Sequence, residues 1–318
     1  MTKKISKTLT LLLITFSLIS VNNINSEAIS VKAKIKRAEI LKYLTFLKNA
    51  VLNFGQPSQI EKFEKIKEEY SNALSFYYEA TVPIPKNFTN NYLVAYRSFL
   101  EIQEKIEKLS EILSQSYINR TQELLQRASK DLVDISIRYH RDSPLVKRFL
   151  KNSNPENEVK SYNPKDFHKL YDKRPIIVNI KKGYSTLGLA RIVRQKALDL
   201  ENYLEAEQLK KGIPATMRKA RIESYLKVIE LARQAKINAI MTFQLLNRNK
   251  EYCVQVSYGK NRYMHEGKLD PVFDPRIPQD YVKDANDSLN RNHEDEMNIK
   301  IKQALLGKDK SAKGKCDY

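Results

Sequence analysis

Apolar and small side chains recur at a helical period from Thr89 to Asp142, a stretch without Gly or Pro. The mean step is about 3.6 residues, which is the period of a straight α-helix. One helix over this stretch would be roughly 80 Å long, so we expect other helices to lie along it. Two helices with a break near Ser116 to Asn119 are the alternative. The recurring positions are Tyr92, Tyr96, Phe99, Ile102, Ile106, Leu109, Leu113, Tyr117, Thr121, Leu124, Ala128, Leu132, Ile135 and Tyr139.

Four more stretches show a helical pattern, and nearly all Gly and Pro residues fall between them. Ser58 and Glu61 have the spacing of a capping box, which predicts the start of the second helix. Short connections in the N-terminal half favour antiparallel packing of successive helices. The sequence therefore predicts an all-α, elongated protein of long helices in two helical lobes. The four stretches are residues 31–54, 58–80, 186–211 and 216–249.

Two regions do not follow the helical pattern. The segment from Asn152 to Ser185 holds three prolines and predicts a linker, in which Ile176 to Ile180 is interpreted as extended chain packed on a helix. A Pro-rich segment with aromatic residues begins at Tyr258 and ends at Tyr281. The predicted organisation is a signal peptide at 1–28, an N-terminal helical bundle at 29–151, a linker at 152–184, a C-terminal helical lobe at 185–306 and a basic tail at 307–318.

The first residues have the pattern of a secretory signal peptide. Three lysines precede an apolar run from Leu9 to Val21, which is short for a membrane span. Small residues at Ser26 and Ala28 predict cleavage after Ala28, and an uncleaved anchor is the alternative. No long apolar run follows, so the mature chain is expected to be exported and without a transmembrane segment.

The chain is strongly basic, with 56 Lys and Arg against 37 Asp and Glu and a formal net charge of +19. An exported basic protein meets acidic surfaces such as membrane headgroups, cell-wall polymers or acidic protein assemblies. Export argues against nucleic acid as a natural partner. Cys253 and Cys316 are the two cysteines, and a disulfide between them is left open.

Catalytic and metal-binding motifs are missing from the sequence. The four His residues share no helical turn and do not lie at ligand spacing from a Cys. Asp280, Asp284 and Asp287 lack the Gly turn and final Glu of a calcium loop. Carboxylates alternate with lysines, which is typical of a solvated helix face. We therefore expect no enzyme, no cofactor, no metal and no small-molecule substrate.

The Pro-rich segment holds the residues that we predict to bind other proteins. Three prolines stiffen it, and its aromatic and apolar side chains can act as anchors. Such a segment packs either on the helices of its own chain, which we favour, or on a partner. The candidate residues are Tyr258, Arg262, Tyr263, Phe273, Arg276 and Tyr281.

Three stretches are similar to the flagellar-coiling proteins of Leptospira-type spirochaetes, which form part of the flagellar filament sheath. They are residues 133–141, residues 235–240 and the Pro-rich residues 269–281. The resemblance implies a bent, α-helical protein in the periplasm. It implies that the chain binds other sheath or core proteins laterally, coats one side of the flagellum and shapes the filament. The alternative is a basic binding module or adhesin for an acidic polymer or membrane surface.

Overall fold

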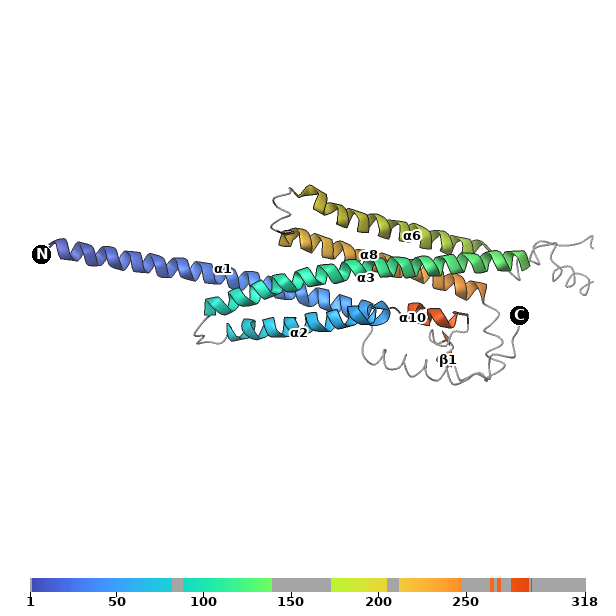
Figure 1. The fold of residues 1–318 in the computed structure, drawn as a ribbon, viewed down its shortest axis with the longest axis horizontal. Coiled ribbons are helices and arrows are strands. Elements are labelled where there is room, and N and C mark those ends of the chain that lie inside the picture. The colour runs from blue at the N-terminus through green and yellow to red at the C-terminus, as the bar shows by residue number, and fades with distance from the viewer. Residues whose placement is uncertain are drawn as a thin grey trace, which may run out of the picture. The chain divides into compact units, whose positions relative to one another are not determined.

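The computed structural model describes residues 2–81, 88–138, 173–204, 212–247, 264–265, 268–269, 276–285 and 287 (Figure 1). Long helices dominate, so the all-α prediction is confirmed. The only strands in these ranges form a two-residue antiparallel pair. The elements are α1 (Thr2–Phe54), α2 (Pro57–Glu79), α3 (Phe88–Arg138), α6 (Lys173–Asp199), the 3₁₀ helix η1 (Leu200–Tyr203), α8 (Ala215–Leu246), β1 (Met264–His265), β2 (Lys268–Leu269), the 3₁₀ helix η2 (Gln279–Tyr281) and α10 (Val282–Ala285).

Helix α3 is unbroken through Ser116 to Asn119, so the single-helix interpretation is confirmed. Tyr139 lies outside the described residues, and ten of the other thirteen predicted stripe positions are buried, so the helical period identified the inward face correctly. These ten are Tyr92, Phe99, Ile102, Ile106, Leu109, Leu113, Tyr117, Thr121, Leu124 and Ala128.

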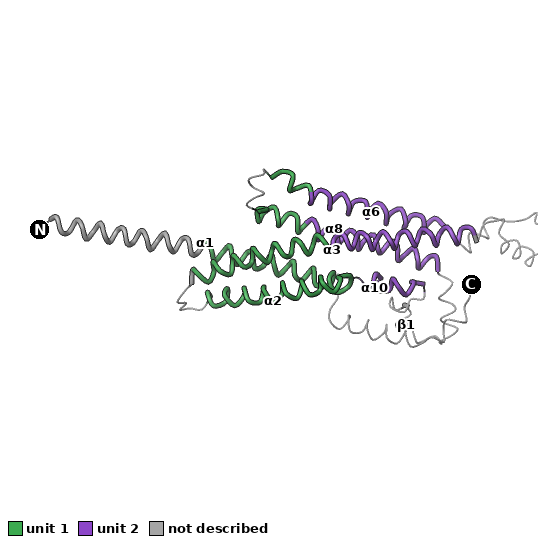
Figure 2. Tube along the Cα trace, in the orientation of Figure 1, with its two compact units in different colours: residues 1–112, 199–223 green, residues 113–198, 224–318 purple. Residues whose placement is uncertain are grey.

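The chain forms two compact units, drawn in different colours in Figure 2. Unit 1 comprises residues 1–112 and 199–223, and unit 2 comprises residues 113–198 and 224–318. The division falls inside α3 and α8, whereas the sequence placed it at the linker 152–184. Each unit thus combines segments that are distant in sequence. The elongated and bent shape stays a prediction.

Unit 1 packs α1, α2 and the first part of α3 in antiparallel order. Tyr77 of α2 meets Tyr92 of α3 edge to face, and Tyr70, further back along α2, lies against Phe99, further along α3. Arg37 of α1 lies over the Tyr77 ring at 4.9 Å. Aromatic pairs of this kind add about 0.5–1.5 kcal/mol each beyond their buried area. The numerous tyrosines of the chain therefore fill helix seams here.

Unit 2 packs α6 and parts of α3 and α8 around one apolar core. Its buried members include Leu124 and Leu125 of α3, Leu187 of α6 and Phe243 of α8. Gly183 lets α6 approach closely, because a Cβ at this position would lie 2.5 Å from Cδ2 of Leu125. Gly188, on the same helix, would meet nothing within 4 Å. A larger residue at position 183 would thus force Leu125 to move, whereas one at position 188 would meet no such obstacle.

The sequence placed the start of α6 wrongly. The stretch from Ile176 to Ile180, interpreted as extended chain, is helical, and the helix begins at Lys173 rather than at Thr186. Pro175 lies in the first turn, where a proline costs little because the missing N–H has no helical partner. The helix also ends at Asp199, and η1 follows, whereas the prediction extended to Lys211.

The start of α2 also differs from its prediction. Pro57 occupies the first turn, and Gln56 rather than Ser58 is the N-cap residue. The backbone N–H of Gln56 donates to Oε1 of Gln59 at 3.0 Å, in the manner of a capping box. Because proline fixes a helical φ, the helix begins two residues earlier than a Ser58 N-cap would place it.

Candidate functional site

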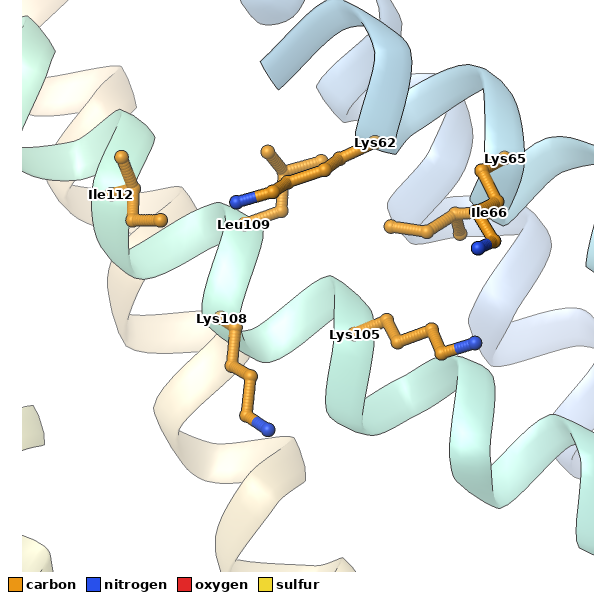
Figure 3. Close-up of a pocket in the computed structure, with 7 residues that line it drawn as sticks. All are labelled: Lys62, Lys65, Ile66, Lys105, Lys108, Leu109 and Ile112. Carbon is orange, nitrogen blue, oxygen red and sulfur yellow. The ribbon is translucent and has the colours of Figure 1, made fainter. Parts of the chain in front are cut away.

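A groove of about 270 Å³ lies between α2 and α3 within unit 1 (Figure 3). We call it the lysine groove, and each of the two helices contributes two lysines to it at a spacing of three residues. This spacing places both lysines of a pair on one helix face. The lining residues are Lys62, Lys65, Ile66, Lys105, Lys108, Leu109 and Ile112.

The four lysines differ in their ion pairs. Lys105 pairs with Glu69 at 2.5 Å, and Lys108 pairs with Glu104 at 2.9 Å. Within the described ranges, Lys62 and Lys65 have no carboxylate partner and are exposed. The groove therefore carries two positive charges that the described residues leave uncompensated, both on α2.

The floor of the lysine groove is apolar. Ile66 and Leu109 are buried members of the helix seam, whereas Ile112 is 41% exposed. Lysine stems are themselves apolar and hold the ammonium group at the water boundary. The groove thus offers an apolar strip bordered by cations, which is suited to an apolar side chain flanked by carboxylates.

The structure describes two of the six predicted binding residues, and their binding role stays a prediction. Tyr258, Arg262, Tyr263 and Phe273 lie outside the described residues. Tyr281 stacks on Phe243 with ring centres 5.4 Å apart, and the Arg120 guanidinium lies over its ring at 4.9 Å from the ring centre.

Arg276 and its neighbour are also placed in unit 2. Ile277 is buried in the unit 2 core, and the backbone carbonyl of Arg276 accepts a hydrogen bond from Asn247. In the described part, this segment packs on helices of its own chain, as we favoured. The structure brings Arg276 and Tyr281 to one end of the unit 2 core, and it does not join them to the lysine groove.

Three cations and two carboxylates form the unit 2 ion cluster, namely Arg120, Arg233, Lys236, Asp284 and Asp287. The Lys236 ammonium lies 3.1 Å from Asp284 and 2.6 Å from Asp287, and all three side chains are at most 1% exposed. Arg233 reaches Asp287 at 3.0 Å, and Arg120 reaches Asp284 at 2.9 Å. The cluster fixes the short segment 276–287 to α3 and α8.

Six residues form the unit 1 ion cluster: Glu104, Glu107, Glu111, Glu201, Arg218 and Arg221. Arg221 is buried and meets Glu107 at 2.8 Å, Glu111 at 3.6 Å and Glu201. Arg218 meets Glu104 at 3.0 Å and Glu107 at 3.5 Å. Burial raises the pKa of Glu107, and the two guanidinium groups oppose that effect. The cluster joins the start of α8 to α3.

The sequence interpretation missed the lysine groove because alternating Lys and Glu were assigned to a solvated face. Lys62 and Lys105 lie more than 40 positions apart, so only the antiparallel packing of α2 and α3 brings them together. The sequence did contain one sign of the groove, because Ile112 is a large apolar residue outside the buried stripe of α3.

No protein-family model, curated protein sequence or solved structure matches this chain. Among the helices that the structure describes, none is both long enough and apolar enough to cross a membrane. The described residues also contain no group of three or more His, Cys, Asp or Glu side chains that could hold a metal ion.

Proposed function

We propose that this chain is an exported structural protein that binds other proteins laterally, as a sheath component of a periplasmic flagellar filament. The lysine groove is the observation that carries the binding role. The resemblance to flagellar-coiling proteins and the signal-like N-terminus support the location. The partner is a sheath or core protein that presents an acidic, partly apolar helix or segment.

The chemistry of the lysine groove favours such a partner. Single exposed ion pairs contribute only about 0–1 kcal/mol each, so the lysines alone would give weak binding. An apolar side chain that covers Ile112 and the lysine stems adds burial, at roughly 25 cal/mol per Å². Lys62 and Lys65, whose charges the described residues leave uncompensated, then increase the rate at which an acidic partner associates and repel basic partners.

The test is the incorporation of variants into filaments in the native cells. Lys62→Glu combined with Lys65→Glu should strongly reduce the amount of protein that co-purifies with flagella. Lys42→Glu combined with Lys48→Glu is the matched control, because it changes the charge equally at exposed positions of α1. Circular dichroism should show unchanged helicity for both variants. Equal incorporation of the two variants would contradict the groove as the contact.

A separate variant tests the contribution of the apolar strip to binding. Ile112→Gln replaces an exposed apolar side chain with a polar one that an exposed helix position accepts. We expect it to reduce incorporation without changing the salt dependence of binding. Normal incorporation of this variant would show that the lysines act without the apolar strip.

The alternative function is a basic binding module or adhesin for an acidic polymer or membrane surface. The net charge of +19 favours it. It predicts retention on anionic vesicles or heparin that falls with rising salt and is weakened equally by the groove variant and its control. Retention of this kind, without co-purifying filament proteins, would replace the filament proposal.

A further inference from the structure

A second pocket, of about 250 Å³, lies between α3 and α6 within unit 2. We call it the guanidinium pocket, because two arginines of α6 face amide side chains of α3 across it. The polar lining residues are Gln115, Asn119, Gln122, Arg191, Arg194 and Gln195. No carboxylate lines this pocket, which separates it from both ion clusters.

The two arginines have neutral partners. Nη2 of Arg191 donates to Oε1 of Gln122 at 2.7 Å, and Nε of Arg194 donates to Oγ of Ser114 at 3.3 Å. In the described ranges neither guanidinium has a carboxylate at ion-pair distance, whereas Arg218, Arg221 and Arg233 each have one. Each guanidinium has five N–H donors, so most of them remain for a ligand.

The amides that line the pocket are oriented to donate as well. Oδ1 of Asn119 accepts a hydrogen bond from Nε2 of Gln115 at 2.7 Å. Oε1 of Gln122 accepts from Arg191. With these carbonyl oxygens engaged, Asn119 and Gln122 present their amide N–H groups. The pocket therefore offers two positive charges and several donors, and two of its four amide carbonyl oxygens already accept hydrogen bonds.

We propose that the guanidinium pocket binds an oxyanion, either a carboxylate or a phosphate group. Hydrogen bonds from guanidinium to such anions are charge-assisted, and the planar fork can bind two oxygens at once. Arg191 and Arg194 lie three residues apart on one helix face, so both can reach the same anion. This inference does not depend on the filament proposal, since it concerns another unit and a small ligand.

The test is isothermal titration of the full chain with inorganic phosphate and, separately, with succinate at constant ionic strength. We expect saturable binding of at least one anion. Tighter binding of phosphate would indicate a phosphate group as the ligand, and tighter binding of succinate would indicate a carboxylate. Arg191→Gln combined with Arg194→Gln should weaken binding about tenfold or more. Arg127→Gln combined with Lys130→Gln removes two exposed positive charges elsewhere on α3 and should leave binding unchanged.

Two further variants distinguish a specific anion-binding site from nonspecific attraction to positive charge. Arg191→Lys combined with Arg194→Lys keeps the charge and loses the fork, so it should also weaken binding. Asn119→Asp is nearly isosteric at an exposed position and should weaken binding by repulsion, even if the arginine variants fail to fold. Absence of saturable binding, or equal weakening by the Arg127 and Lys130 control, would overturn the proposal.

Discussion

In unit 2, a buried lysine and two arginines hold two aspartates that belong to a segment of about a dozen residues. In unit 1, two arginines hold glutamates of α3 and η1, and three of the four glutamates keep contact with water. The two clusters contain similar ion pairs, yet they join elements of very different size. The segment 276–287 contains a four-residue helix, which has no stability by itself.

The difference shows what each cluster contributes. In unit 1, α3 is already held by its buried stripe, so the ion pairs add specificity to a contact between long helices. In unit 2, the other described support of the short segment is limited to apolar packing of residues such as Ile277 and Tyr281 and a few hydrogen bonds to its backbone. A buried ion pair is costly to break because the remaining partner stays desolvated. The unit 2 cluster should therefore be the more sensitive to substitution.

The largest effect is expected for Lys236→Met. The substitution removes the ammonium that the buried Asp284 and Asp287 share and leaves each of them with one arginine, Arg120 or Arg233, which should cost about 3 kcal/mol. Chemical denaturation followed by circular dichroism measures the free energy of unfolding. Lys227→Met is the control, because Lys227 is half exposed and should change stability by under ~0.5 kcal/mol. Similar losses for the two variants would show that the cluster does not hold the segment.

Arg221→Met should have the next largest effect, at about 2 kcal/mol. Glu107 keeps Arg218 as a partner, and Glu111 and Glu201 are 34% and 43% exposed, so water compensates them. The same denaturation experiment gives the comparison with Lys236→Met. A loss as large as that of Lys236→Met would remove the distinction between the clusters.

The two glycines of α6 give a pair of opposite effects. Gly183→Ala should destabilise unit 2 by about 1 kcal/mol, because the clash with Leu125 outweighs the gain in helix propensity. Gly188→Ala should stabilise it by roughly 0.5–1 kcal/mol, because the new methyl group meets nothing. Melting temperatures should move in opposite directions. Equal shifts would mean that α6 does not approach α3 as closely as described.

The smallest effect concerns Glu39, at the edge of unit 1. Burial alone would raise the pKa of Glu39, but hydrogen bonds from Lys219 and Lys36 outweigh this effect and hold the pKa below its ordinary value. Because the pKa is lower in the folded chain, the ionised Glu39 stabilises the fold at pH values above the ordinary pKa of a glutamate. This contribution disappears as the pH falls through the pKa of the folded state. Glu39→Gln should therefore cost under ~1 kcal/mol at neutral pH, since Lys219 is 44% exposed.

As a control for Glu39→Gln, the stability of this variant and of the wild type is compared again at acidic pH. Below the lowered pKa the wild-type carboxyl is protonated, so the difference in unfolding free energy between the two proteins should vanish. A difference that stays constant from neutral to strongly acidic pH would show that packing, rather than charge, explains the effect.

The helical period predicted most of the fold because it depends on local spacing. It identified the α3 stripe, the stretch that forms α8 and the all-α class. It failed where apolar runs are ambiguous: Ile176 to Ile180 has the composition of a strand, and Pro175 suggested a break. Tertiary packing against α3 and α8 decided in favour of helix there.

The charged sites were beyond sequence reasoning for another reason. Lys236 lies between apolar positions of α8 and gives no sign that it is buried. Its partners Asp284 and Asp287 are almost 50 residues away, so only the folded chain brings them together. The lysine groove and the guanidinium pocket likewise combine residues from separate helices. Periodicity reveals which face is inside and does not reveal which charges will meet.

Tyr117 gives the unit 2 ion cluster an optical signature. Its hydroxyl group lies 3.4 Å from Asp287 and 3.3 Å from Arg233, and its ring lies 4.9 Å from the Lys236 ammonium. Burial, reinforced by Asp287, raises the pKa of Tyr117. With 18 tyrosines and no tryptophan, the near-ultraviolet absorbance of the chain comes almost entirely from phenols. In an alkaline titration, the late ionisation of the Tyr117 phenol would report when the segment 276–287 detaches.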